Sequence, residues 1–141
     1  MYLLDTNIVS ELRKNKPNGA VSAWFDSVPA AEIRVSAVVM GELQAGVERT
    51  RRQDPQKAVD IEHWIDRIGN TFAVVTMDGD AFREWARLMA ATPDDLSVDA
   101  MIAATARIHS LTVVTRNVKD FTTFSVPILN PFDGMSYLPS A

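Results

Sequence analysis

The stretch YLLDTN at residues 2–7 decides how this chain folds, because its apolar run ends directly at an acidic residue. The run is typical of a buried strand, and the spacing of the apolar residues after it predicts a helix over residues 6–14. Asp5 would therefore lie where a strand ends and a helix begins. A carboxylate at that point either caps the helix or belongs to a site at the sheet edge, and this segment alone favours neither.

The same order, a short apolar strand followed by a helix, repeats along the chain. The sequence predicts further strands at residues 33–35, 72–75, 111–114 and 126–129. Ser36, Asp54 and Ser97 are expected to cap three of the helices between them. Pro127 predicts that the last strand lies at an edge of the sheet. This alternation indicates one domain, residues 1–141, of class α/β, with a central parallel sheet of about five strands flanked by helices on both faces.

Composition limits the kinds of site that this domain can contain. The 141 residues include no cysteine, so neither a disulfide nor a thiolate metal site can form. The two histidines, His63 and His109, do not stand at a spacing typical of paired metal ligands. Any metal would therefore be bound through oxygen, which favours Mg²⁺ or Mn²⁺ over zinc.

The net charge of −4 argues against a broad basic surface for nucleic acid. Basic residues gather locally instead, and each cluster is interpreted either as a solvated helix face or as a contact for phosphates. The clusters are Arg13, Lys14 and Lys16, and then Arg49, Arg51 and Arg52. The first residues do not resemble a signal peptide, and no apolar run approaches membrane-spanning length. We therefore expect a cytoplasmic protein with no membrane partner.

Four acidic residues stand at the ends of apolar runs or near the start of apolar helices: Asp5, Glu42, Asp99 and Asp120. Each has a structural alternative, because acids also cap helices, interact with the helix dipole or remain solvated in loops. Asp99 is favoured over Asp94 and Asp95, since a helix fixes ligand geometry better than a proline-containing loop does.

The carboxyl ends of parallel strands meet at one edge of a sheet, so the four carboxylates are predicted to converge there. Carboxylates that are brought together repel one another, and without a cation at least one of them takes up a proton. A hard divalent cation removes that repulsion, activates a water molecule and stabilises the charge of a phosphoryl transition state. Thr115 and Asn117 are further candidates for this site, through hydrogen bonding or ligation.

These motifs, in this order, resemble the PIN-domain ribonucleases that act as toxins in VapBC toxin–antitoxin pairs. The resemblance spans nearly the whole chain, and the TRNxxDF segment at residues 115–121 is similar to the FitB-like branch. The matching stretches are residues 3–7, 36–43, 99–106, 114–121 and 126–132. One departure is Ser97-Val98, where such proteins often have proline directly before the acid.

The resemblance implies a PIN-like three-layer fold and a Mg²⁺- or Mn²⁺-dependent endoribonuclease. It assigns the four acids to a catalytic and metal-binding site, supported by Thr6, Asn7 and Asn117. It also implies a homodimer, an RNA substrate, and a cognate antitoxin that covers the site and binds operator DNA as a complex.

In the expected mechanism, a water molecule attacks a phosphodiester of RNA while Asp5 or Asp99 helps to remove its proton, and Arg116 steadies the developing charge. An aspartyl-nucleophile phosphatase is a rival, but it would have a second acid two residues after the first, where this chain has Asn7. A non-catalytic binding module, in which the acids only cap helices, is the other rival. Such a module would show no affinity for Mn²⁺.

Overall fold

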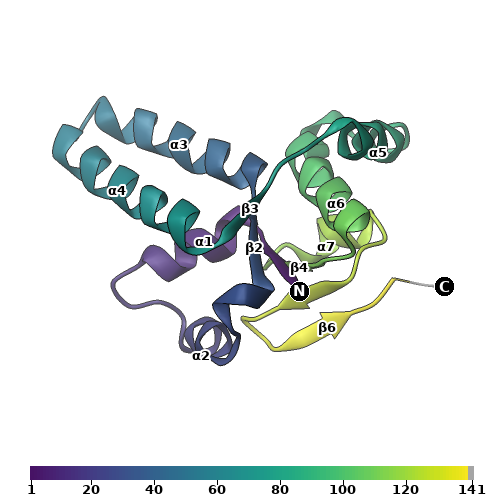
Figure 1. Cartoon of the computed structure of the whole chain (residues 1–141), viewed down its shortest axis with the longest axis horizontal. Helices are drawn as coiled ribbons and strands as arrows, with labels where there is room; N and C mark the ends of the chain where they lie inside the picture. Colours follow the sequence, from purple (N-terminus) through teal and green to yellow (C-terminus); the bar gives the residue numbers. More distant parts are fainter. Residues whose placement is uncertain (140–141) are drawn as a thin grey trace.

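A six-stranded sheet flanked by helices forms the centre of the molecule in the computed structural model, which describes residues 1–139 (Figure 1). The order of the strands across the sheet is β3-β2-β1-β4-β5-β6. They are β1 (Tyr2–Leu4), β2 (Ile33–Ser36), β3 (Ala73–Val75), β4 (Thr112–Val114), β5 (Ile128–Asn130) and β6 (Met135–Tyr137). The predicted α/β class, with helices on both sides of a sheet, is confirmed.

Helices follow each of the first four strands. The chain contains α1 (Thr6–Arg13), α2 (Gly19–Ser27), α3 (Ala37–Arg51), α4 (Pro55–Thr71), α5 (Gly79–Met89), α6 (Ser97–His109) and α7 (Val118–Thr122), with short 3-10 turns η1 (Ala30–Glu32) and η2 (Asp94–Leu96). Figure 1 shows α3 and α4 on one side of the sheet and α5 and α6 on the other. None of the helices within residues 1–139 is both long and apolar enough to cross a bilayer.

The path of the chain through the sheet reverses beside β1. It runs outward from β1 to β2 and β3, and then crosses back to β4 on the other side of β1. Right-handed crossovers in opposite directions place the two sets of helices on opposite faces. The carboxyl ends of β1 and β4 are therefore adjacent at the point of reversal, which is where ligands bind in open α/β sheets.

The strands at the centre of the sheet are buried on both faces. Leu3 and Leu4 in β1 and Val113 and Val114 in β4 are almost inaccessible to solvent. Strands covered by helices on both faces have continuous apolar runs rather than alternating ones, as these short stretches do. The core fixes the two central strands and, with them, the polar residues that follow each strand directly.

Several helix starts agree with the sequence prediction. Ser36 caps α3 by accepting from the N–H of Val38, and Asp54 caps α4 by accepting from the N–H of Lys57. Ser97 was predicted to cap α6, but it is the first residue of that helix, because the turn η2 leads directly into α6.

The sheet differs from the predicted one at its C-terminal side. The predicted parallel strands are present as β1 to β5, and a sixth strand that was not predicted, β6, pairs antiparallel with β5. The strand that contains Ile128 is therefore internal, and Pro127 precedes it rather than marking an edge. The carbonyl of Pro127 accepts a hydrogen bond from the N–H of Val113, so its missing donor does not interrupt the ladder.

Candidate acidic active site

Asp5 lies directly after β1 and has two structural roles at once. Its Oδ1 accepts from the N–H of Thr6 at 2.8 Å, which makes it the cap of α1. Its Oδ2 accepts from the Thr115 hydroxyl at 2.8 Å and from the Asn7 amide at 3.2 Å. The side chain is only 5% exposed. The capping alternative and the site alternative are therefore compatible, because one carboxylate oxygen serves the helix and the other faces the segment after β4.

Thr115 connects the two central strands at their carboxyl ends. Besides donating to Asp5, its hydroxyl oxygen accepts from the N–H of Asn117 at 2.9 Å and lies 3.4 Å from the Asn7 amide nitrogen. Thr115 is completely buried. This network holds the first residues of α1 against the segment that leads into α7.

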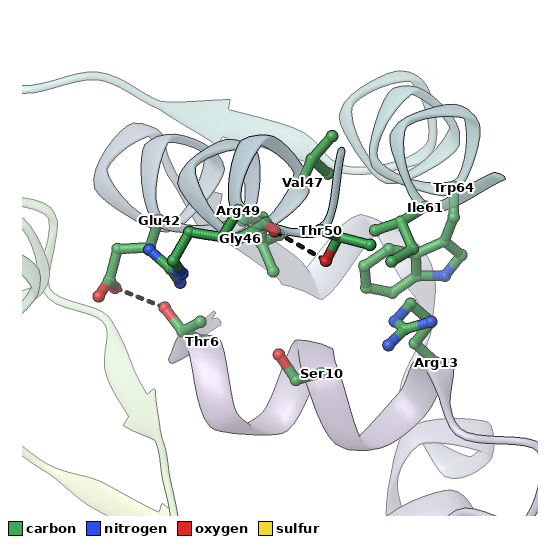
Figure 2. Close-up of a pocket in the computed structure, with 11 residues that line it drawn as sticks. Thr6, Ser10, Arg13, Glu42, Gly46, Val47, Arg49, Thr50, Ile61 and Trp64 are labelled. Atoms are coloured by element: carbon green, nitrogen blue, oxygen red, sulfur yellow. Dashed lines mark hydrogen bonds between the residues drawn. The ribbon is translucent and has the colours of Figure 1, made fainter. Parts of the chain in front are cut away.

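Glu42 reaches the same region from the sixth position of α3. Its Oε1 accepts from the hydroxyl of Thr6 at 2.6 Å, a short distance typical of a charge-assisted hydrogen bond (Figure 2). Thr6 directly follows Asp5 in the chain, so a single turn of α1 brings two of the predicted acids close together.

Asp99 and Asp120 share one amide group. The Nδ2 of Asn117 donates to Oδ2 of Asp120 at 2.8 Å and to Oδ2 of Asp99 at 3.3 Å. Asp99 lies in the first turn of α6, as predicted, whereas Asp120 lies in the first turn of the short helix α7 rather than in a loop. Asp120 is thus brought to the same amide as Asp99.

The negative charges of the other three acids act on Asp99. The pKa of Asp99 is raised to about 6, first by burial and then by the negative charges of Asp5, Asp120 and Glu42, in that order. Burial also raises the pKa of Asp5, although its hydrogen bonds from Thr115 and Thr6 oppose the rise. Within residues 1–139, none of the four acids forms an ion pair with a basic side chain.

Arg116 contributes to the site through its backbone. Its N–H donates to the side-chain oxygen of Asn7 at 3.3 Å, which orients the Asn7 amide toward Asp5. Its guanidinium lies 4.5 Å from the centre of the Phe132 ring, and its charge is among the smaller influences that lower the pKa of Glu11. The structure therefore joins Asn7, Thr115 and Asn117 to the acids by side chain, and Arg116 by main chain.

A groove opens beside the Glu42–Thr6 hydrogen bond, between α1 and the hairpin of α3 and α4 (Figure 2). Sequence analysis did not identify it, because its walls come from three helices that are separate in the chain. The signal that could have revealed it was the spacing of Thr6, Ser10 and Arg13, which places three polar residues on one face of α1.

An α/β sheet whose carboxyl ends gather unpaired acids defines a class of domain suited to acid–base or metal-assisted chemistry on an anionic substrate. The sequence profile of the PIN domain matches residues 2–124. The chain belongs to the PIN-domain family.

Similar proteins carry the names of toxins and ribonucleases. The chain is 35% identical to VapC ribonuclease Y4jK of Sinorhizobium fredii and 33% identical to Toxin FitB of Neisseria gonorrhoeae, covering 94% of this chain and 99% of each relative. Its fold is similar to that in the solved structure of FitAB bound to the IR36 DNA fragment, with a TM-score of 0.82 and 29% identity over 94% of this chain and 96% of that one.

Proposed function

We propose that this chain is a Mg²⁺- or Mn²⁺-dependent endoribonuclease, the toxin of a toxin–antitoxin pair, acting in the cytoplasm as one domain over residues 1–141. The observation that carries the proposal is that four carboxylates from four segments gather without a basic partner among residues 1–139. Burial first, and then the charges of the other three acids, raise the pKa of Asp99 to about 6. The names of the relatives, a VapC ribonuclease and a FitB toxin, support RNA as the substrate class.

The residues fit a hard divalent cation. Asp5, Glu42, Asp99 and Asp120 offer only oxygen atoms, the ligand type that Mg²⁺ and Mn²⁺ prefer. Within residues 1–139 no three acidic or imidazole side chains form a ready-made metal cage. Mg²⁺ does not require one, because it usually keeps several waters and binds one or two carboxylates directly. When bound, the ion would lower the pKa of a water molecule and stabilise charge on the phosphoryl group.

The chain's own residues would orient the reactants and move a proton. In hydrolysis, the water oxygen bonds to phosphorus, the bond from phosphorus to the leaving ribose oxygen breaks, and that oxygen takes up a proton. Asp99, held by the Asn117 amide, is positioned to accept the proton of the attacking water at its carboxylate. Asp5 is fixed by the Thr6 N–H and the Thr115 hydroxyl, so its geometry does not depend on the substrate.

The partners follow from the family. We propose that a cognate antitoxin covers the acidic site, that operator DNA is bound only through the toxin–antitoxin complex, and that the chain forms a homodimer. The similarity to FitAB bound to DNA supports the first two parts of this proposal.

The test is to express the chain and its Asp5→Asn variant and to sequence the ends of the RNA fragments. New fragment ends that require Asp5 would support the ribonuclease assignment, and identical ends in both samples would contradict it. Titration with Mn²⁺ in a calorimeter separates the rivals, because a module whose acids only cap helices would bind no metal. A trapped phospho-aspartate would instead support the phosphatase.

A further inference from the structure

The groove beside the acidic site continues along α1 and α4. Its first part, about 220 Å³ in volume, begins at Thr6 and Glu42 and contains Arg49 from α3. Its second part, about 500 Å³, contains Lys57 and Arg67 from α4. Arg13, Ile61 and Trp64 line both parts, so the two adjoin at these side chains. We call this channel the basic groove and define it by Thr6, Arg13, Arg49, Lys57, Trp64 and Arg67.

The basic groove is formed by matching faces of three helices. On α1, Thr6 and Arg13 are seven residues apart, or two turns, and so lie on one face. On α3, Glu42 and Arg49 show the same spacing. On α4, Lys57 and Trp64 are again two turns apart, with Arg67 one turn further on. In Figure 2, Arg49 lies at the Glu42 end of the first part and Arg13 lies beside Trp64.

Cations in the basic groove lack acidic partners, although cations close by in the sequence have them. Lys14 pairs with Glu11 at 2.9 Å, and Arg51 pairs with Glu48 at 3.0 Å. Across the described residues, Arg13, Arg49, Lys57 and Arg67 form no ion pair. The chain has more acidic than basic residues, with a net charge of −4, and yet these four cations of the basic groove are unpaired within the described residues.

Two acids also line the groove, and together with the four cations they leave it with a net charge of +2 (4 − 2). Asp60, in the second part, accepts a hydrogen bond from Gln56 at 3.2 Å. Glu42, at the other end, is bound to Thr6 and belongs to the acidic site. Unpaired cations along a channel attract a chain of phosphates, and an aromatic ring within it offers a stacking surface for a base.

We propose that the basic groove holds a single-stranded segment of the RNA substrate, with its phosphates against the four cations and one base stacked on Trp64. This inference rests on the proposed ribonuclease function and extends it to the substrate's path. The strand is single because a base in a duplex is already stacked between its neighbours and cannot also cover the indole. The acidic end of the groove then receives the phosphate that is cleaved.

The first test measures how RNA binding depends on salt. The probe is a fluorescein-labelled, unstructured RNA oligonucleotide, and Asp99→Asn is present in every protein so that the probe stays intact. Removing one cation that touches a phosphate should reduce the slope of log affinity against log salt by about 0.7. Arg49→Gln and Arg67→Gln should each show that reduction and bind several-fold more weakly. Arg83→Gln is the matched control, because Arg83 is an exposed cation on α5 that forms no ion pair with any residue of the described part, 1–139.

The second test concerns the base on Trp64. Trp64→Leu preserves an apolar side chain but removes the aromatic face, and should weaken binding of the RNA about tenfold or more. The same variant should bind an abasic oligonucleotide of equal length as the parent does. Trp64→Phe keeps an aromatic face and should retain most of the affinity, which distinguishes stacking from a loss of folding.

Equal RNA affinity and equal salt slopes in Arg49→Gln, Arg67→Gln and Arg83→Gln would overturn the inference. An acidic protein segment would then be the favoured occupant of the groove. In that case the nuclease proposal would stand, provided that the chain without Asp99→Asn still cleaves RNA. A chain that neither cleaves nor binds RNA would overturn both proposals.

Discussion

Two carboxylates on the packed pair of helices α5 and α6 have opposite electrostatic surroundings. Glu84, on α5, is 14% exposed and accepts hydrogen bonds from Arg87 at 2.8 Å and from Arg107 at 2.9 Å. Arg87 and Arg107 lower its pKa. For Asp99, in the first turn of α6, burial and then the charges of Asp5, Asp120 and Glu42 raise the pKa to about 6. Glu84 therefore has two guanidinium partners, whereas among residues 1–139 none of the four acids of the acidic site forms an ion pair.

The difference shows what distinguishes a structural charge from a functional one. A partly buried charge is costly unless it is paired, so a protein selected only for stability would pair or neutralise each of the four acids. Unfavourable local electrostatics that persist in a folded structure mark functional sites. Substitutions of Asp99 and of Glu84 test this contrast.

The largest effect is expected on catalysis. Asp99→Asn removes the proposed proton acceptor and should reduce RNA cleavage by about 10²–10⁴-fold, a range typical of general acid–base groups. Glu84→Gln removes the carboxylate that is paired with Arg87 and Arg107, and it should leave the cleavage rate of the folded protein unchanged. Both variants should be assayed on the same RNA with Mg²⁺ present. Comparable losses in the two variants would mean that the contrast reflects folding rather than chemistry.

An intermediate effect is expected at Thr115, which positions Asp5. Thr115→Val keeps the shape of the side chain but removes its hydrogen bond to Asp5. Replacing a residue that hydrogen-bonds to a metal ligand typically lowers metal affinity about 10–100-fold. Mn²⁺ binding measured by calorimetry should therefore weaken by about that factor. Thr105→Val is the matched control, because the buried Thr105 hydroxyl donates only to the carbonyl of Met101. Metal affinity should not change in the control, and an equal loss in both variants would refute the positioning role.

The smallest effect is expected on stability as the pH changes. The pKa of Asp99 is raised from 3.8 to about 6 in the folded chain, so its stabilising contribution is complete below pH 3.8 and is lost as the pH rises through about 6. The free energy of unfolding of the metal-free protein should therefore fall by about 1 kcal/mol across that window, a modest value because Asp99 is partly in contact with solvent. Glu84 acts in the opposite sense, since its lowered pKa gives stability above pH 4.5 that is lost on acidification below it.

Urea unfolding between about pH 4 and pH 7.5, with and without Mn²⁺, measures this contribution. The fall in stability should disappear in Asp99→Asn, and added Mn²⁺ should reverse it in the parent. A decline of the same size in Asp99→Asn would exclude Asp99 as its source.

Local chemistry made much of the fold predictable. Ser36 and Asp54 cap their helices as predicted, because a polar residue before an apolar periodic segment is a strong local signal. Strand β6 was missed, since Met135–Tyr137 is exposed at every position and has no alternating pattern. The turn before it depends on Gly134 at φ +73°, a left-handed conformation that glycine adopts without strain.

The places of the candidate acids in the fold were predictable from the sequence, but the hydrogen bonds that connect them were not. The carboxyl end of β1 located Asp5, and the first turn of α6 located Asp99. The amide bridge from Asn117 to Asp99 joins residues 18 positions apart, and no local pattern reports such a contact. The basic groove was not predicted, because the spacing of Thr6, Ser10 and Arg13 gives only one of its walls and α1 meets α4 only in the folded chain.

The ladder between β1 and β4 also limits how the length of this chain can vary. Leu4 is paired with Val114, and the N–H of Asp5 donates to the carbonyl of Val114 at 2.9 Å. Because successive residues of a strand point to opposite faces, one inserted or deleted residue in either strand would turn Asp5 away from Thr115. Natural variants should therefore keep both three-residue strands intact and accumulate insertions and deletions elsewhere.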